Sequence, residues 1–168
     1  MQQVAQEIKN LSIGFTSKKG EQISILKNIS TTINKGETVG IVGESGSGKS
    51  TLALAMMGYV KHGLFTISGE CIYQSNDILK MKNRELENIR GRKIAMIPQN
   101  AGQSLTPNLK IGYQIDEALR LHTNFQKEDR DVKISELLNK VRLPSPETIA
   151  KRYPHELSGG QQQRVAVA

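Results

Sequence analysis

Alternating apolar and polar residues near the start of the chain predict antiparallel strands with one solvated face. The alternation runs from Ile8 to Phe15 and from Gln22 to Ile33, and a polar turn over residues 16–21 separates the two segments. A third segment with strand character covers Phe65 to Tyr73. The first part of the chain is therefore expected to be mainly β.

Two short apolar runs predict strands of a different kind, buried on both faces. They cover Thr38 to Val42 and Lys93 to Ile97, and Pro98 stops the second. A loop rich in Gly and Ser follows the first run, and Thr51 to Met57, rich in Ala, Leu and Met, then predicts a buried helix.

Helical periodicity dominates the later part of the chain. One amphipathic helix is predicted from the face made by Ile111, Ile115, Ala118, Leu119 and His122. A second, ending near Pro144 and Pro146, is predicted from Val132, Ile134, Leu137, Leu138 and Val141. A helical insertion from about residue 104 to 155 is therefore expected.

Composition narrows the class of protein. The 168 residues include one cysteine, Cys71, which excludes an intramolecular disulfide framework and fits a reducing cytoplasm. The longest apolar stretch, Leu52 to Val60, is too short for a membrane-spanning helix, and the N-terminus lacks the pattern of a secretory signal. A soluble, basic, cytosolic protein is expected.

The net charge of +7 leaves two interpretations, nucleic-acid binding or a solvated basic surface. No run of five Lys or Arg occurs, aromatic residues are only 4%, and Trp is absent, so the chain offers little for stacking on bases. We therefore expect a solvated basic surface and no nucleic-acid partner.

One glycine-rich motif predicts a phosphate site. Residues 43–50, Gly43-Glu44-Ser45-Gly46-Ser47-Gly48-Lys49-Ser50, satisfy G-x-x-x-x-G-K-[ST], and Thr51 follows. The glycines bring backbone N–H groups close to phosphate oxygens, Lys49 supplies a positive charge for the β and γ phosphates, and the Ser50 hydroxyl suits Mg²⁺. A predicted strand before the loop and a predicted helix after it are the context that the motif requires.

A second glycine-rich turn opens a helix near the end of the chain. Leu157-Ser158-Gly159-Gly160-Gln161 offers backbone N–H groups and the Ser158 hydroxyl to an anion. Taken alone, the same residues could simply cap a helix.

The two motifs in this order resemble the nucleotide-binding domain of ATP-binding cassette (ABC) transporters over almost the whole chain. The resemblance implies an α/β fold, with a P-loop NTPase sheet, an antiparallel β subdomain and a helical subdomain. It also implies that residues 43–51 bind ATP and Mg²⁺, while Ser158, Gly159, Gly160 and Gln161 bind the ATP of a second subunit.

The resemblance gives roles to two further residues. Gln99 matches the glutamine that contacts Mg²⁺ and the attacking water and couples to the membrane subunits, and a polar residue after a strand is the alternative. Phe15 matches the aromatic residue that stacks on adenine, and a core phenylalanine is the alternative. Stretches around residues 41–50, 107–112 and 153–158 are similar to importers of peptides and of nickel, and residues 97–107 look closer to the nickel type.

The family's next elements are absent from the 168 residues. These are an apolar run ending in Asp-Glu (Walker B), which supplies the general base, and a switch histidine. Ile115-Asp116-Glu117 is interpreted as an exposed helix face, and His62, His122 and His155 are poor candidates for the base. The chain is therefore expected to be a fragment, lacking the C-terminal part of the domain, that binds ATP far better than it hydrolyses it.

The resulting expectation is the ATPase subunit of an importer for peptides or nickel, at the cytoplasmic face of the membrane. Residues 1–103 would form the nucleotide-binding core with its β subdomain, 104–155 the helical subdomain, and 156–168 the signature motif with its helix. The implied partners are a second ATPase subunit, identical or paralogous, membrane permease subunits and, indirectly, a solute-binding protein. A soluble ABC ATPase for DNA repair or translation is the alternative, and the second motif argues against an unrelated P-loop kinase or GTPase.

Overall fold

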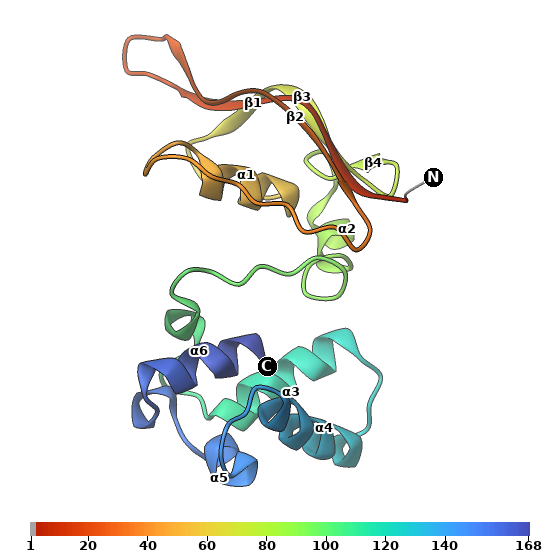
Figure 1. The fold of residues 1–168 in the computed structure, drawn as a ribbon, viewed down its shortest axis with the longest axis vertical. Helices are drawn as coiled ribbons and strands as arrows, with labels where there is room; N and C mark the ends of the chain where they lie inside the picture. Colours follow the sequence, from red (N-terminus) through yellow and green to blue (C-terminus); the bar gives the residue numbers. More distant parts are fainter. Residues whose placement is uncertain (1–2) are drawn as a thin grey trace. The chain divides into compact units, whose positions relative to one another are not determined.

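The computed structural model describes residues 3–168, which form two compact units (Figure 1). The first unit ends at Ile94 and the second begins at Ala95. The division into a core over residues 1–103, a helical subdomain over 104–155 and a signature segment over 156–168 stays a prediction.

The first unit contains a four-stranded antiparallel sheet in the order β2-β1-β3-β4. Its strands are β1 (Val4–Thr16), β2 (Gln22–Asn34), β3 (Phe65–Tyr73) and β4 (Asn76–Asp77). The strands β1 and β2 and the turn between them confirm the prediction made from the alternating residues, and β3 confirms the third predicted strand.

The sheet bends where bulges in neighbouring strands coincide. Asn10 and Asn28 have positive φ angles, and the registers of β1 against β2 and β3 shift at this point. Gly69 on β3 has φ +82°, and a Cβ there would fall among the backbone atoms of Asn10 and Lys9, so only glycine fits. Figure 1 shows the bent strands passing over α1 (Lys49–Met56).

The core of the first unit lies between this sheet and α1. Leu52 and Ala55 of α1 are buried with apolar residues of the strands and of α2 (Asn83–Glu87). One polar side chain enters this core, because the Gln6 amide donates to the Met56 carbonyl oxygen at 2.6 Å and to the Cys71 sulfur at 3.2 Å. Burial raises the pKa of the Cys71 thiol to about 11, although the hydrogen bond from Gln6 acts in the opposite direction.

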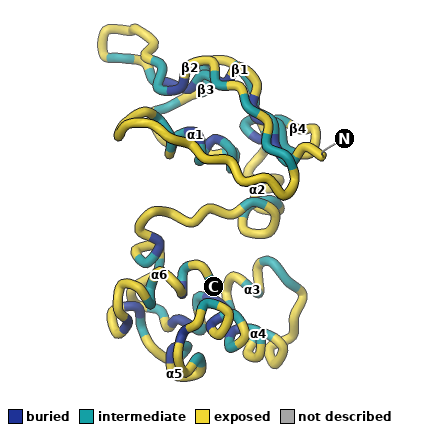
Figure 2. The backbone as a smooth tube through the Cα atoms, viewed as in Figure 1, coloured by how far each residue is buried: buried dark blue, intermediate teal, exposed yellow. Residues whose placement is uncertain are grey.

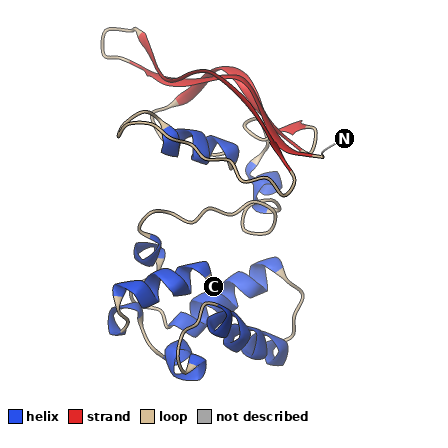
Figure 3. Ribbon diagram, in the orientation of Figure 1, coloured by secondary structure: helices blue, strands red, loops and turns tan. Residues whose placement is uncertain are grey.

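The two runs expected to be buried strands do not form strands. Residues 38–42 are irregular and exposed, with Val42 94% accessible, and residues 93–97 make only one isolated bridge, between Arg90 and Ile94 (Figures 2 and 3). A buried strand needs hydrogen-bonded neighbours, and no strand within residues 3–168 pairs with either run along its length. The apolar character of these two runs was therefore not sufficient to predict a strand.

The second unit is helical, as the periodicity predicted. Its main helices are α3 (Ile111–His122), α4 (Lys127–Lys140), α5 (Pro146–Lys151) and α6 (Gly159–Val167), with short 3₁₀ helices η1 (Ala101–Ser104) and η2 (Pro154–Glu156). These elements enclose a second apolar core made of Ile111, Ile115, Ile134, Leu138, Leu143, Ile149, Leu157 and Val165.

Two residues assigned to the apolar helix faces lie outside this core. Ala118 is exposed on α3, and Val132 is 62% accessible near the middle of α4. The remaining members of the two faces are buried or half-buried, since a helix turns its apolar stripe toward its neighbours. Within residues 3–168, no helix combines the length and the apolar character needed to span a bilayer.

Candidate functional site

The glycine-rich loop of residues 43–48 leads directly into the first turn of α1. Gly46 and Gly48 have φ angles of +82° and +92°, which side-chain-bearing residues rarely adopt. A Cβ on Gly48 would lie only 2.8 Å from the Leu26 Cδ2 atom. The turn therefore requires glycine both for its conformation and for its packing against β2.

Lys49, the first residue of α1, folds back over this loop. Its ammonium group donates to the carbonyl oxygens of Gly43 at 2.7 Å and Glu44 at 2.6 Å, with the Ser47 hydroxyl 3.4 Å away. These bonds hold a positive charge against the loop, in the position that the motif predicts for a phosphate counter-charge.

The start of α1 presents unpaired donors. No hydrogen bond among the described residues uses the backbone N–H groups of Gly48, Lys49 or Ser50. The first turn of α1 carries no acidic residue, so nothing on the helix opposes the positive end of its dipole. This end of α1 is suited to bind an anion.

The chemistry of these groups fits a nucleotide triphosphate with Mg²⁺. The backbone donors and Lys49 match phosphate oxygens, and the Ser50 hydroxyl, exposed at the first turn, is an oxygen ligand of the kind that Mg²⁺ prefers. Glu44, Ser45 and Ser47 are also exposed on the loop, whereas Thr51 is half-buried in α1.

Phe15 lies near the end of β1, opposite Ile23 of β2. Its side chain is half-buried and does not belong to the apolar cluster between the sheet and α1. A half-buried aromatic ring outside the core is compatible with the stacking role that was predicted for it.

The second glycine-rich turn caps α6. The Ser158 hydroxyl accepts from the Gln161 backbone N–H at 3.3 Å, and the Gln161 side-chain oxygen accepts from the Ser158 backbone N–H at 3.0 Å. A Cβ on Gly159 or Gly160 would meet nothing within 4 Å in this chain. Packing in the chain therefore does not require either glycine, although glycine weakens a helix.

Gln99 lies in an exposed turn of the second unit, just before η1. The segment that follows it packs closely against α6. The approach is so close that a Cβ on Gly102 would lie 2.9 Å from the Cβ of Gln162. Gln162 is held in turn by hydrogen bonds from its amide to the carbonyl oxygens of Pro154 and Leu157. No pattern in the sequence indicates this contact, which depends on the packing of η1 against α6.

The acidic pair in α3 has a structural role. Asp116, predicted to be exposed, is half-buried and forms ion pairs with Arg120 and with Arg130 of α4. The prediction of an exposed face was wrong for this residue because α4 packs against α3, while Glu117 is exposed. His155 is exposed and stacks on Tyr153, with ring centroids 5.7 Å apart.

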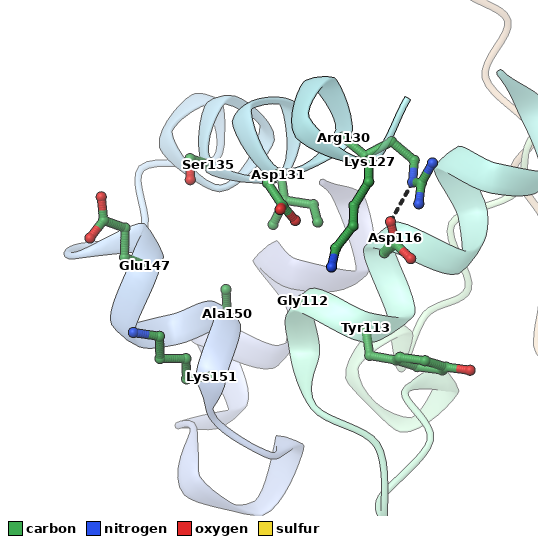
Figure 4. A pocket seen from close by; sticks show the side chains of 11 residues that line it. Gly112, Tyr113, Asp116, Lys127, Arg130, Asp131, Ser135, Glu147, Ala150 and Lys151 are labelled. Carbon is green, nitrogen blue, oxygen red and sulfur yellow. Dashed lines mark hydrogen bonds and ion pairs between the residues drawn. The ribbon is translucent and has the colours of Figure 1, made fainter. Parts of the chain in front are cut away.

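A pocket of about 460 Å³ lies among α3, α4 and α5 (Figure 4). Lys127 of α4 extends toward Gly112 of α3, beside the ion pair of Asp116 with Arg130. The lining carries both signs of charge and includes none of the site residues predicted from the sequence.

Comparison with known proteins agrees with the two glycine-rich motifs. The profile of the ABC transporter family matches residues 26–168, which is well over half of the chain. The chain belongs to the ABC transporter family. The resemblance inferred from its motifs is therefore confirmed, and so is the mixed α/β cassette fold with its antiparallel sheet.

Two curated relatives of this ABC protein carry names that refer to transport or import. The oligopeptide transport ATP-binding protein OppD of Bacillus subtilis (strain 168) is 39% identical over 169 residues, which cover 96% of this chain and 45% of that protein. The glutathione import ATP-binding protein GsiA of Escherichia coli (strain K12) is 38% identical over 167 residues, covering 96% and 27%. The chain thus spans less than half the length of these relatives.

Solved ABC cassettes share the fold. A dimeric structure of the cassette MJ0796 in a post-hydrolysis state, bound to ADP and Pi, matches with a TM-score of 0.82 at 31% identity, covering 96% of this chain and 67% of that one. The structure of cbiO1 from Clostridium perfringens matches with a TM-score of 0.71 at 20% identity, covering 98% and 60%, and supports the fold alone.

Proposed function

We propose that the chain binds ATP with Mg²⁺ through residues 43–51 and acts as the ATP-hydrolysing subunit of an ABC importer. The observation that supports this most strongly is the combination at the start of α1: free backbone N–H groups, the positive helix end and the Lys49 ammonium on one loop. A single anionic ligand could contact all three.

In this proposal, the groups that contact the nucleotide have separate roles. The N–H groups of the loop and Lys49 would hold the β and γ phosphates, and the Ser50 hydroxyl would be a ligand for Mg²⁺. The contact of Gln99 with Mg²⁺ stays a prediction from the resemblance. The bound metal ion supplies charge neutralisation on the phosphate oxygens. Phe15 stacks on the adenine ring, which is consistent with its place outside the packed core.

In the proposal, the capped start of α6 contacts the nucleotide bound by a second subunit. Gly159 and Gly160 offer backbone N–H groups, and a Cβ on either residue would meet nothing within 4 Å among residues 3–168. Ser158, Gly159, Gly160 and Gln161 would thus contact ATP held by a partner cassette, identical or paralogous. The dimeric form of MJ0796, a relative, supports such an arrangement.

The solute is proposed to be a peptide. The names of OppD and GsiA, which refer to oligopeptide transport and to glutathione import, support this class. Nickel is the second candidate, favoured by residues 97–107, where Asn100 follows Gln99 in place of the acidic residue of the commoner peptide pattern. Closure of two cassettes would then move permease subunits at the cytoplasmic face of the membrane, with a solute-binding protein acting on the other side.

Co-purification tests the importer against the soluble alternative. The tagged protein is isolated from detergent-solubilised membranes of its native cell, and the proteins bound to it are identified by mass spectrometry. An importer subunit should bring down integral membrane permease subunits. Recovery of DNA-repair or ribosomal proteins without any permease would contradict the proposal and favour a soluble ABC ATPase.

A further inference from the structure

Arg90 closes the C-terminal end of α1, the helix whose first turn carries the proposed phosphate site. Its Nε atom donates to the Met57 carbonyl oxygen and one terminal nitrogen donates to the Gly58 carbonyl oxygen, both at 2.9 Å. The guanidinium carbon also lies 6.0 Å from the centre of the Tyr59 ring. The arginine thus contacts three consecutive residues at the end of one short helix.

Backbone hydrogen bonds close the last turn of α1, and the contacts of Arg90 add to them. Gly58 has φ +72°, and its N–H donates to the Ala55 carbonyl oxygen while the Tyr59 N–H donates to that of Leu54. A Cβ on Gly58 would lie 2.8 Å from the Ile78 carbonyl oxygen. The Met56 carbonyl oxygen accepts from the Gln6 amide, and those of Met57 and Gly58 accept from Arg90.

Three features favour arginine for this task. The planar guanidinium donates two roughly parallel bonds to neighbouring carbonyl groups, a geometry that the single ammonium group of lysine does not reproduce. A cation at a helix C-terminus stabilises the helix dipole. The ring of Tyr59 adds a further favourable surface for the cation.

Because α1 has only eight residues, a change at one end reaches the other. Such a helix is about 12 Å long. If the whole helix tilts slightly about its C-terminal end, its first turn moves with it. That first turn holds Lys49 and the N–H groups that face the proposed phosphate site. Fixing the last turn therefore fixes the donors at the first.

We propose that Arg90 is a positioning residue for the nucleotide: it holds the C-terminal end of α1 so that the loop at its N-terminal end keeps its phosphate-binding geometry. This inference rests on the proposed ATP binding. The side-chain hydrogen bonds of Arg90 within the described residues go to Met57 and Gly58, so its effect on the loop is exerted through α1.

The test compares ATP affinity in the purified chain and four variants, measured with Mg²⁺ and a fluorescent ATP analogue. Arg90→Ala should weaken binding about tenfold or more, and Arg90→Lys, which keeps the charge without the planar fork, about threefold or more. Arg92→Ala removes an exposed arginine two residues away and should leave the affinity unchanged. Ile8→Val, a small cavity at a β1 position of the same core, controls for a general loss of stability.

A second readout separates positioning from stability. In NMR spectra without nucleotide, the amide signals of Lys49 and Ser50 should shift in Arg90→Lys and stay in place in Ile8→Val. Affinity within about twofold of the parent in Arg90→Lys, or an equal loss in Ile8→Val, would overturn the inference. Absence of ATP binding by the unaltered chain would instead refute the proposed function.

Discussion

Ser158 and Gln161 bind each other reciprocally at the start of α6: the Ser158 hydroxyl accepts from the Gln161 backbone N–H, and the Gln161 side chain accepts from the Ser158 backbone N–H. The hydroxyl is thus already engaged in capping the helix. The donors that remain for a ligand at this turn are the Ser158 hydroxyl proton, the side-chain N–H groups of Gln161 and the backbone N–H groups of Gly159 and Gly160.

Removing the cap should cost stability. Ser158→Ala leaves the first turn of α6 without its side-chain acceptor and should lower the free energy of unfolding by about 1 kcal/mol. Ser158→Asp keeps an acceptor at the same position and should stay close to the parent chain. Urea denaturation followed by circular dichroism measures both, and equal stability of the Ala variant and the parent would contradict the capping role.

The Asp variant also tests the proposed contact with a partner's nucleotide. A carboxylate at residue 158 would repel a triphosphate bound by a second cassette, while the chain's own site at residues 43–51 would be unchanged. ATP affinity should therefore be retained and ATP-dependent dimerisation lost, as measured by light scattering after size-exclusion chromatography. If the parent protein dimerises with ATP and Ser158→Asp dimerises equally well, the proposed role of this turn is wrong.

Gly102 and Gly160 give a matched pair of glycine substitutions. Gly102→Ala places a methyl group against the Cβ of Gln162, whose amide is held by two carbonyl groups, and should destabilise the protein by about 1–3 kcal/mol. Gly160→Ala adds its methyl group to open space at a helical position and should be neutral or stabilising by up to about 1 kcal/mol. Thermal unfolding distinguishes the two, and similar melting temperatures would contradict the packing of η1 on α6.

Cys71 should make stability sensitive to alkaline pH. Burial raises its pKa to about 11, so the fold keeps the thiol protonated where the unfolded chain ionises it, near pH 8.5. The unfolded state then binds fewer protons, and the free energy of unfolding falls as pH rises from about 8.5 toward 11. Urea denaturation at several pH values should show a shallower fall for Cys71→Ala, and parallel curves would contradict this.

The same burial should protect the thiol from reagents. At pH 8, Cys71 in the folded chain should react with a disulfide reagent far more slowly than in urea, because the reactive thiolate is disfavoured and covered. Equal rates in the two conditions would show that the thiol is exposed in solution.

Local patterns in the sequence predicted much of the fold. Alternation predicted β1 and β2, strand character predicted β3, and helical periodicity predicted α3 and α4, because the periodic patterns reflect which side of an element is buried. Residues 38–42 and 93–97 were predicted as strands and are not, since a strand depends on distant partners that its own residues do not reveal.

Some parts of the candidate site were likewise predicted from the sequence, and others became visible only in the structure. The phosphate loop was predicted from its motif, because a backbone that binds anions needs glycine at fixed positions. The turn at Ser158 was assigned a role through the resemblance to the ABC family, and the binding roles of both stay predictions. Arg90 and the contact of Gly102 with Gln162 were missed, because nothing near them in the sequence distinguishes them from any surface arginine or loop glycine. Their importance arises only from the packing.

Isothermal titration calorimetry with ATP and Mg²⁺ tests the central claim most directly. The parent chain should show saturable binding at one site, and Lys49→Ala should bind at least about tenfold more weakly, a loss of about 1.4 kcal/mol, because it lacks the cation held against the loop. Lys61→Ala, which removes an exposed lysine elsewhere in the same unit, should bind as the parent does. No binding heat with the parent chain, or equal affinity in Lys49→Ala, would contradict the account.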